Sequence, residues 1–268
     1  MSSSLIRSKR IVSQNLAGYL IELANYALFP LKSRLSVAKG AKNKFVIFCH
    51  GRSGSTLLLN LLNSHPDIDC DGEILSRKVF SPSMLIKCRS LITSKRNYGF
   101  KLLSYQLRDI QKVGNPKKFM EDLHSNGYKI IFLRRSNMLR LVLSVMYAEF
   151  RNEWHHKKTD GKVIQNKMHV DVEEMMKRLR ESDETYNFES DVMRDIPHIP
   201  ISYERDLENS QSHSTTVRNI AEFLGISFSI PSNPSIVKIT PKGLDGFIEN
   251  VDEVKQALKG TKFEKYLD

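Results

Sequence analysis

The sequence predicts an α/β fold, a single domain in which a mainly parallel β-sheet is flanked by helices. Three observations predict it. Short apolar runs, typical of buried parallel strands, alternate along the chain with longer segments whose apolar residues recur at helical spacing. The first apolar run ends in a glycine-rich turn that leads into a helix. The length, 268 residues, suits one such domain with a substantial core.

The elements are expected in the following order. Phe45 to Phe48 is an uninterrupted apolar run and therefore a strand, whereas the leucines after residue 56 repeat at helical spacing. Further strands are expected at 68–70, 100–105, 129–133 and 199–203, and further helices at 82–93, 116–123, 137–150, 171–193 and 217–224. Ser136 is the expected N-cap of the helix at 137–150. Residues 1–40 are expected to form an N-terminal helical extension, and residues 41–268 the domain itself.

The turn after the first strand indicates an anion site. It reads Gly51-Arg52-Ser53-Gly54-Ser55-Thr56. Its two glycines let the backbone approach a ligand closely, and the helix start offers unpaired N–H groups and the positive end of the helix dipole. Ser55 and Thr56 add hydroxyl donors. The segment is a P-loop-like strand–loop–helix, but no lysine precedes its Ser/Thr pair as in a Walker A loop, which disfavours a standard ATPase or GTPase.

The segment GRSGSTLLLNLLNSHP resembles the 5′-phosphosulfate-binding loop of sulfotransferases that use 3′-phosphoadenosine 5′-phosphosulfate (PAPS). The resemblance is to the carbohydrate-type and bacterial branch of that family. The resemblance implies that the loop wraps the 5′-phosphosulfate of PAPS, with Arg52 facing the bridging oxygen. It covers residues 44–268, which would be the sulfotransferase domain, and its specific motifs lie at 51–73 and 130–144. It also implies sulfonate transfer to a hydroxyl, and the acceptor expected from the resemblance is a carbohydrate or glycolipid.

A second segment, FLRRSNMLRLVLS, carries the resemblance further. Arg134 and Arg135 follow a strand at the edge where open α/β sheets bind ligands, and guanidinium groups suit phosphate oxygens. The family's 3′-phosphate-binding segment likewise has an arginine at a strand end and a serine on the next helix, here Ser144. Arg134 is narrowly preferred as the phosphate ligand, and Arg135 stays open. The alternative is that the arginines are solvated or paired with acids, and that Ser144 bonds back along its own helix. The cofactor-binding residues expected from both segments are Gly51, Arg52, Ser53, Gly54, Ser55, Thr56, Arg134, Arg135 and Ser144.

Glu73 is the candidate catalytic base, with Arg52 as the second catalytic residue. Glu73 follows the short strand at 68–70, where the chain leaves the sheet beside the loop, and members of the bacterial branch that resemble this chain place a glutamate there. In the hypothesised mechanism Glu73 takes the proton of the acceptor hydroxyl while Arg52 holds the departing phosphate. The alternative is that Glu73 caps the next helix. No metal is expected, because the reaction requires none.

Two other functions stay open. One is an atypical P-loop kinase or phosphotransferase, and the other is a non-catalytic basic module of the same fold that binds anionic glycans or membrane lipid. The formal net charge of +11 favours polyanionic ligands, and we interpret it as spread along the chain. No zinc-finger spacing, RNP-like pattern or lysine-rich tail marks a nucleic-acid reader, so none is expected as a partner.

The N-terminal extension and the cysteines bear on location. Residues 13–31 carry an apolar stripe at helical spacing with basic flanks, which could rest on a membrane surface or, as the preferred alternative, pack on the domain or on a second subunit. No signal peptide is recognised. Cys49, Cys70 and Cys88 show no CxxC pair and favour a reducing compartment. A cytoplasmic protein is expected, with peripheral membrane contact as an option, and its oligomeric state is open.

Overall fold

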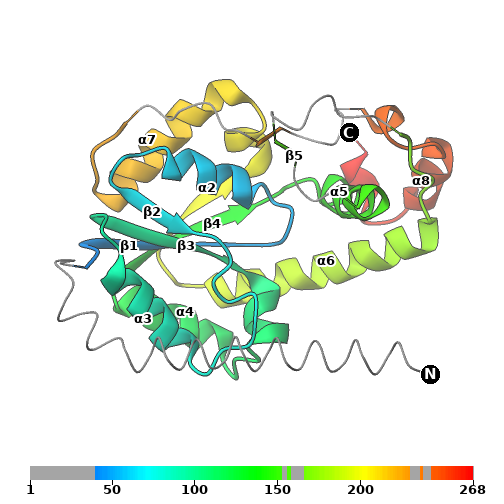
Figure 1. Ribbon diagram of the computed structural model, residues 1–268. Helices are drawn as coiled ribbons and strands as arrows, with labels where there is room; N and C mark the ends of the chain where they lie inside the picture. The colour runs from blue at the N-terminus through cyan, green and yellow to red at the C-terminus, as the bar shows by residue number, and fades with distance from the viewer. Residues whose placement is uncertain (1–39, 153–155, 158–165, 230–235, 238–242, 268) are drawn as a thin grey trace, which may run out of the picture.

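The computed structural model describes residues 40–152, 156–157, 166–229, 236–237 and 243–267. Its centre is a five-stranded parallel sheet with strand order β2-β3-β1-β4-β6 (Figure 1). The strands are β1 (Asn43–Cys49), β2 (Ile68–Asp71), β3 (Asn97–Leu103), β4 (Tyr128–Arg134) and β6 (His198–Ser202). A separate antiparallel pair joins β5 (His156–Lys157) to β7 (Ile236–Val237). The predicted α/β class with a mainly parallel sheet is confirmed.

Helices cover both faces of the sheet. In Figure 1, α3 (Pro82–Ile92) and α4 (Pro116–Ser125) lie on one face, and α2 (Ser55–Asn63) and α7 (His213–Leu224) on the other. The long helix α6 (Val172–Met193) packs at its start against α5 (Met138–Arg151) and α8 (Val251–Leu258) and ends beside the sheet. Short helical turns are η1 (Gln106–Ile110), η3 (Tyr203–Leu207), η4 (Ser210–Ser212), η5 (Leu244–Gly246) and η6 (Glu264–Tyr266).

Successive side chains of β1 pack alternately into two hydrophobic clusters, one on each face of the sheet. Val46 and Phe48 are buried in the cluster that includes residues of α3 and α4, whereas Phe45, Ile47 and Cys49 belong to the cluster with α2 and α7. Because successive strand residues point to opposite faces, a continuous apolar run is the expected pattern for a strand covered on both sides. A third cluster joins α5, α6 and α8. The apolar runs of the sequence thus mark the sheet interior correctly.

Several sequence-based boundaries are wrong, and one of them is the start of α7, which lies at His213 rather than at residue 217. β3 begins at Asn97 rather than residue 100 because it pairs with the whole of β1, from Asn43↔Asn97 onward, and it ends at Leu103. The N-cap of α5 is Asn137 rather than Ser136, since the Asn137 side chain accepts a hydrogen bond from the Arg140 amide at 2.9 Å. The adjacent Ser136 amide is satisfied by a carboxylate from another element, as described below.

The N-terminal extension expected at 1–40 lies outside the described residues except for Gly40. Among the helices that the structure does describe, none has both the length and the apolar character to span a bilayer. All three cysteines are free thiols, with Cys49 and Cys70 buried. Burial raises the pKa of Cys49 to about 12.

Candidate active site

The segments singled out in the sequence meet at one edge of the sheet. β1 is in register with β3 and β4, so that Cys49 lies beside Leu103 and Leu133 at the carboxyl ends of the three strands. The Gly51–Thr56 turn, the Arg134–Arg135 pair and the residues after β3 therefore leave the sheet at neighbouring points. This edge is where open parallel sheets place ligands.

The Gly51–Thr56 turn has an unusual backbone conformation at two positions. Arg52 (φ 62°) and Gly54 (φ 90°) both have left-handed conformations. The buried Ser53 hydroxyl donates to the His50 carbonyl oxygen at 2.7 Å. A Cβ atom on Gly54 would lie 2.5 Å from Cδ2 of Tyr203, so this position requires glycine twice over.

The start of α2 is suited to an anion. Gly54 occupies its N-cap position and no side chain in the described part of the chain caps it. The first-turn amides of a helix lack intrahelical acceptors, and the helix dipole favours negative charge there. Thr56 lies in this first turn. An anion would supply the missing acceptors.

Arg135, rather than Arg134, faces this turn. Its Nη1 lies 3.4 Å from the Arg52 carbonyl oxygen and 3.5 Å from Oγ of Ser144. The Arg134 guanidinium instead lies on α6, where Nη2 donates to the Tyr186 carbonyl oxygen at 3.0 Å. The narrow sequence-based preference for Arg134 therefore has the weaker geometric support. Ser144 also donates to the Leu141 carbonyl oxygen at 2.8 Å, which is the back-bonding alternative considered above.

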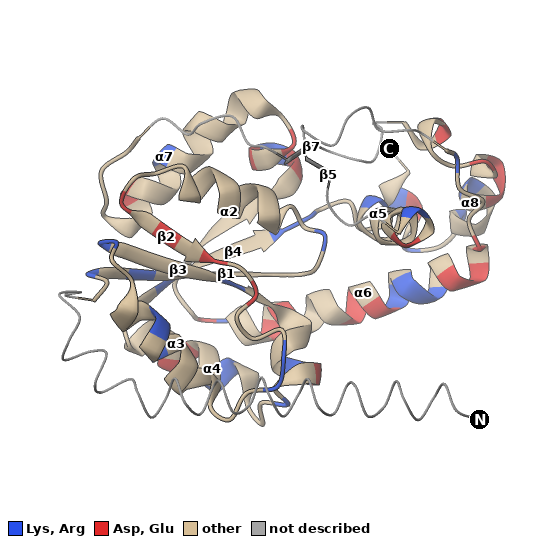
Figure 2. Ribbon diagram, in the orientation of Figure 1, with Lys and Arg blue, Asp and Glu red and all other residues tan. Residues whose placement is uncertain are grey.

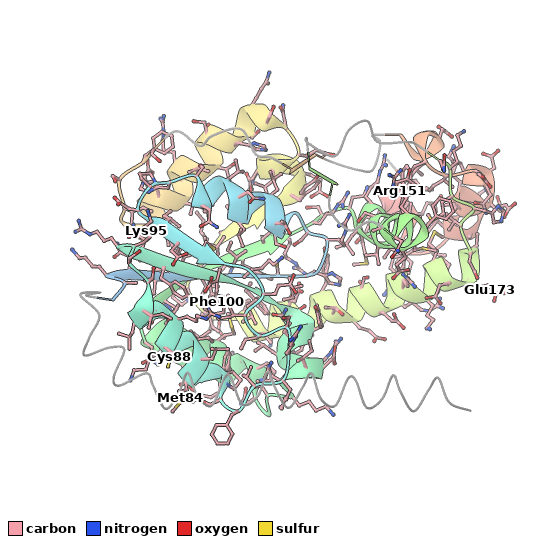
Figure 3. The ribbon with its side chains drawn as sticks, viewed as in Figure 1. Met84, Cys88, Lys95, Phe100, Arg151 and Glu173 are labelled. Carbon is pink, nitrogen blue, oxygen red and sulfur yellow. The ribbon has the colours of Figure 1, made fainter. Side chains whose placement is uncertain are left out.

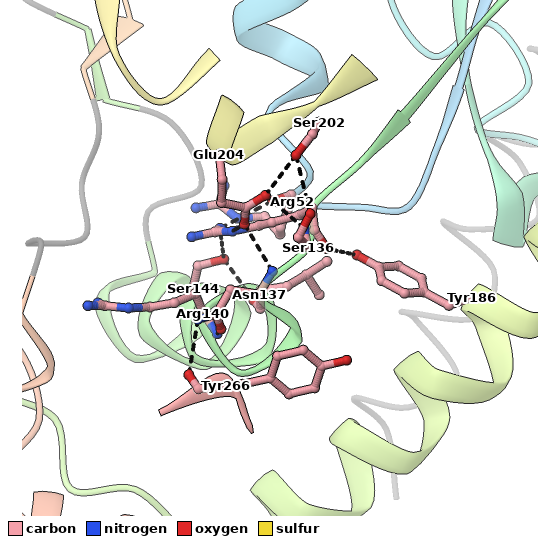
Figure 4. Close-up of polar contacts among 11 residues, drawn as sticks. Arg52, Ser136, Asn137, Arg140, Ser144, Tyr186, Ser202, Glu204 and Tyr266 are labelled. Atoms are coloured by element: carbon pink, nitrogen blue, oxygen red, sulfur yellow. Dashed lines mark hydrogen bonds and ion pairs between the residues drawn. The ribbon is translucent and has the colours of Figure 1, made fainter. Parts of the chain in front are cut away.

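Three buried or half-buried arginines, Arg52, Arg135 and Arg140, lie close enough for the charge of Arg135 to act on the other two. Figure 4 labels Arg52 and Arg140. Burial, and then the positive charge of Arg135, lower the pKa of Arg52 and likewise that of Arg140. Nε of Arg135 is buried and has no hydrogen-bond partner within the described segments, although Oε1 of Glu204 lies 3.8 Å away as an ion pair. A polyanion would relieve the repulsion and accept the unused hydrogen bond.

Glu204 explains how α5 is fixed beside this cluster. Its carboxylate accepts hydrogen bonds from the amides of Ser136 at 2.7 Å and Asn137 at 3.0 Å (Figure 4). A carboxylate at a helix start stabilises the helix through the same unpaired amides that bind phosphate. Tyr203 places its ring against Gly54 and 4.7 Å below the Arg135 guanidinium. The sequence YERDL thus positions both the turn and α5.

Glu73 stands at the same edge in a network of its own. Its Oε1 lies 2.8 Å from Nζ of Lys101, and its Oε2 accepts a hydrogen bond from Nε2 of Gln106 at 2.9 Å. Nζ of Lys101 also lies 3.4 Å from Oγ1 of Thr56, which links Glu73 to the start of α2. The alternative that Glu73 caps the next helix is wrong, because α3 begins at Pro82 with Ser81 as its N-cap.

Lys101 is the residue that sequence reasoning missed. Its side chain is 8% exposed and it comes from the middle of β3, where every residue is buried. A lysine is almost never fully buried unless it is paired. Its position in the run GFKLL was therefore the available signal.

A cavity of about 360 Å³ adjoins the network. Tyr105 lines it, and the Tyr105 hydroxyl lies 3.5 Å from Oε2 of Glu73. The other lining residues are His50, Gly51, Ser104 and Arg108 at the sheet edge, Leu141, Val142 and Val145 of α5, and Glu174, Arg178, Glu181, Ser182 and Thr185 of α6. Burial lowers the pKa of His50, which favours the neutral ring at physiological pH.

One buried carboxylate near the cavity has no counterpart in the sequence analysis. Glu189 of α6 is fully buried, and neither oxygen meets hydrogen-bond geometry with any described residue. Burial raises its pKa to about 7, against the opposing effects of the Ser104 hydroxyl and the charges of Arg134 and Arg108. Among the residues that the structure describes, no group of three His, Cys, Asp or Glu side chains could hold a metal ion.

Several solved structures resemble this one, and two of them are sulfotransferases. No family model matches the sequence, and no curated protein matches it. A sulfotransferase from Alicyclobacillus acidocaldarius superposes with a TM-score of 0.47 and 15% identity, covering 85% of this chain and 96% of that one. Mouse sulfotransferase SULT7A1 complexed with PAP gives a TM-score of 0.46 and 13% identity, covering 85% and 88%. At these values neither likeness assigns a family or an activity, so the function is argued from the site.

Proposed function

We propose that this protein is a PAPS-dependent sulfotransferase that moves the sulfonate group to a hydroxyl of a carbohydrate or glycolipid acceptor. The observation that carries the proposal is the position of Arg135. Its guanidinium lies between the Arg52 carbonyl oxygen, in the turn that leads into the uncapped start of α2, and the Ser144 hydroxyl, within a cluster of arginines. A donor with phosphate groups at both its 3′ and 5′ positions needs two such anion sites close together.

The residues present fit this donor. The Gly51–Thr56 turn, with Arg52 and the first amides of α2, would hold the 5′-phosphosulfate. Arg135 and Ser144 would hold the 3′-phosphate, and Arg135 would thereby replace Arg134 as the preferred ligand. Arg140 would add a third positive charge to this site. When bound, the donor supplies a sulfonate attached to a phosphate leaving group.

Glu73 would serve as the general base. It accepts the proton of the acceptor hydroxyl, and the hydroxyl oxygen forms its bond to sulfur as the bond between sulfur and the 5′-phosphate oxygen breaks. Charge then grows on the departing phosphate, where Arg52 and the α2 amides stabilise it. Lys101 and Gln106 hold the Glu73 carboxylate in place, at 2.8 and 2.9 Å. They are positioning residues, because they act through Glu73.

The cavity beside Tyr105 supports a sugar-like acceptor. It combines aliphatic side chains of α5, such as Val142 and Val145, with hydroxyl and charged groups of α6, such as Ser182 and Glu181. A sugar ring has an apolar face and a polar rim of hydroxyls, so it matches both kinds of surface. The contact of Tyr105 with Glu73 would bring an acceptor hydroxyl near the base.

Incubation with ³⁵S-labelled PAPS and a panel of sugars and glycolipids tests the proposal. Wild-type protein should label at least one acceptor. Glu73→Gln should label none while still binding 3′,5′-ADP, because the amide cannot take the proton. Glu222→Gln, an exposed change on α7, is the matched control and should label as wild type does. Labelling that survives Glu73→Gln would contradict the assigned base. Phosphate transfer from ATP without any ³⁵S transfer would establish the kinase alternative.

A further inference from the structure

The outer face of α3 is the largest concentration of exposed apolar side chains in the described part of the chain. The described part of the chain has six exposed large hydrophobic residues, and four of them lie between residues 80 and 92. These are Phe80 (69% exposed), Met84 (50%), Leu91 (38%) and Ile92 (46%). We call these four residues the α3 stripe.

Three of the four stripe residues lie within α3, on one side of the helix, and Phe80 precedes the helix by two residues. At 100° per residue, Met84, Leu91 and Ile92 fall within one third of the helix circumference, together with Cys88. Ile86 and Ser90, which are buried, lie on the opposite side. Figure 3 shows Met84 on the side of α3 that is turned away from the strand carrying Phe100. The helix therefore has an inner apolar face that fills the core and an outer one that does not.

Positive charge surrounds the stripe. Lys87 and Arg89 flank it on its two sides, and Arg77, Lys78, Lys95 and Arg96 are exposed at its ends. Residues 74–108 contain eight Lys and Arg and no Asp or Glu. One of the flanking cations, Arg89, is paired with Asp71 at 3.9 Å. The neighbouring helix α4 brings Lys117 and Lys118 with Glu121 and Asp122, and so adds no net charge.

The whole net charge of the protein lies in this part of the chain. Residues 1–108 hold 17 Lys and Arg against 5 Asp and Glu, whereas residues 109–268 hold 24 against 25. In Figure 2 the Asp and Glu positions, drawn red, recur along α6 and around α8, interspersed with Lys and Arg positions, drawn blue. The sequence-based interpretation that basic charge is spread along the chain is therefore wrong. The charge is segregated, and α3 stands in the basic part.

From these observations we infer that the α3 stripe and its cations form a surface that binds the anionic headgroups of a lipid bilayer, with the apolar side chains inserted between them. Apolar residues flanked by Lys and Arg are the pattern by which proteins rest on such membranes. A nucleic acid would satisfy the cations but leave Phe80 and Met84 in water. A second copy of α3 would oppose like charges.

The N-terminal segment is a poorer occupant for the same reason. The described chain begins at Gly40, and the Ala41 amide donates to the Ser90 carbonyl oxygen at 2.9 Å, so residues 1–39 join the domain beside the end of α3. They carry six Lys and Arg and one acid, Glu22. Packed on the stripe they would bring positive charge against positive charge. Beside it, they would extend the same basic surface. The inference concerns binding alone and does not depend on sulfonate transfer.

Flotation of the full-length protein with lipid vesicles tests the apolar part. We expect at least tenfold stronger partition onto phosphatidylcholine vesicles containing one third phosphatidylglycerol than onto phosphatidylcholine alone. The double variant Phe80→Ser/Met84→Ser should lose at least tenfold in partition onto the anionic vesicles. Phe150→Ser is the matched control, since Phe150 is 52% exposed but lies on α5, and it should bind as wild type does.

A charge-reversed pair tests the cations. Arg77→Glu/Lys87→Glu should weaken partition at least tenfold, whereas Lys255→Glu/Lys259→Glu on α8, with the same change in net charge, should have little effect. Equal loss in both pairs would show a general charge effect and overturn the inference. So would binding that is the same for neutral and anionic vesicles, or no binding to either. If the stripe variants lower the melting temperature or change the oligomeric state without altering partition, the stripe is covered by protein and the inference is wrong.

Discussion

Replacing Glu189 by glutamine should raise the free energy of unfolding above that of wild type in alkaline solution. In acid the difference between the two proteins should be much smaller. Glu189 is fully buried, and burial raises its pKa from 4.5 to about 7. The folded protein therefore holds this proton more tightly than the unfolded chain does. The contribution of Glu189 to the free energy of unfolding should fall as the pH rises from about 4.5 through 7. Above that range the loss should stay constant.

The expected magnitude follows from the same values. A tenfold change in an ionisation constant corresponds to about 1.4 kcal/mol, so a change from 4.5 to about 7 corresponds to about 3 kcal/mol. Glutamine has the same shape and does not ionise. The free energy of unfolding of Glu189→Gln minus that of wild type should therefore increase by most of this amount between pH 5 and pH 8.5.

Urea unfolding of both proteins at several pH values measures the difference. Glu184→Gln on the exposed side of the same helix is the matched control, and its curve should stay parallel to that of wild type. If the Glu189→Gln curve is also parallel to wild type across this range, the carboxyl group does not change its pKa on folding and the reasoning about its burial fails.

Three further predictions concern the site and the core. Arg135→Ala should weaken 3′,5′-ADP binding by 10- to 100-fold, as expected for a lost charged hydrogen bond, while Arg134→Ala should change it less than threefold in calorimetry; the reverse order would restore Arg134 as the phosphate ligand. Lys101→Met should reduce turnover by about 100-fold with the donor KM nearly unchanged, because Glu73 loses its 2.8 Å partner, and an unchanged turnover would remove Lys101 from the mechanism. Gly99→Ala should destabilise the fold by about 3 kcal/mol in urea unfolding, since its Cβ would lie 2.2 Å from the buried Phe45 ring, and a loss below 0.5 kcal/mol would contradict the packing described.

The elements that could be predicted from sequence are those whose signal is local. The run from Phe45 to Phe48 is apolar because β1 is buried on both faces, and the turn after it contains glycine because Gly54 has a left-handed backbone against Tyr203. The helix at 116–123 is found as α4, since proline at its first position and Asn115 before it mark the start. The local order of residues alone encodes such features.

The parts that could not be predicted depend on residues far apart in sequence. Consecutive residues of an extended chain point to opposite sides, so of Arg134 and Arg135 one had to face α6 and the other the turn. Which one does so depends on where α6 packs, and that is set some 50 residues later. Glu204 reaches Ser136 across 68 residues, and Lys101 meets Glu73 only because β2 and β3 are neighbours. Pattern reasoning cannot supply these pairings.

Isothermal titration with 3′,5′-ADP and with ATP tests the proposed function most directly. Wild-type protein should bind 3′,5′-ADP in the micromolar range and ATP much more weakly, because ATP lacks the 3′-phosphate that Arg135 and Ser144 would hold. Arg52→Ala should weaken the binding of 3′,5′-ADP, because Arg52 would contact its 5′-phosphate. A preference for ATP would contradict the donor assignment and favour a phosphotransferase. Failure to bind either nucleotide would contradict enzymatic use of the site and leave an anion-binding module.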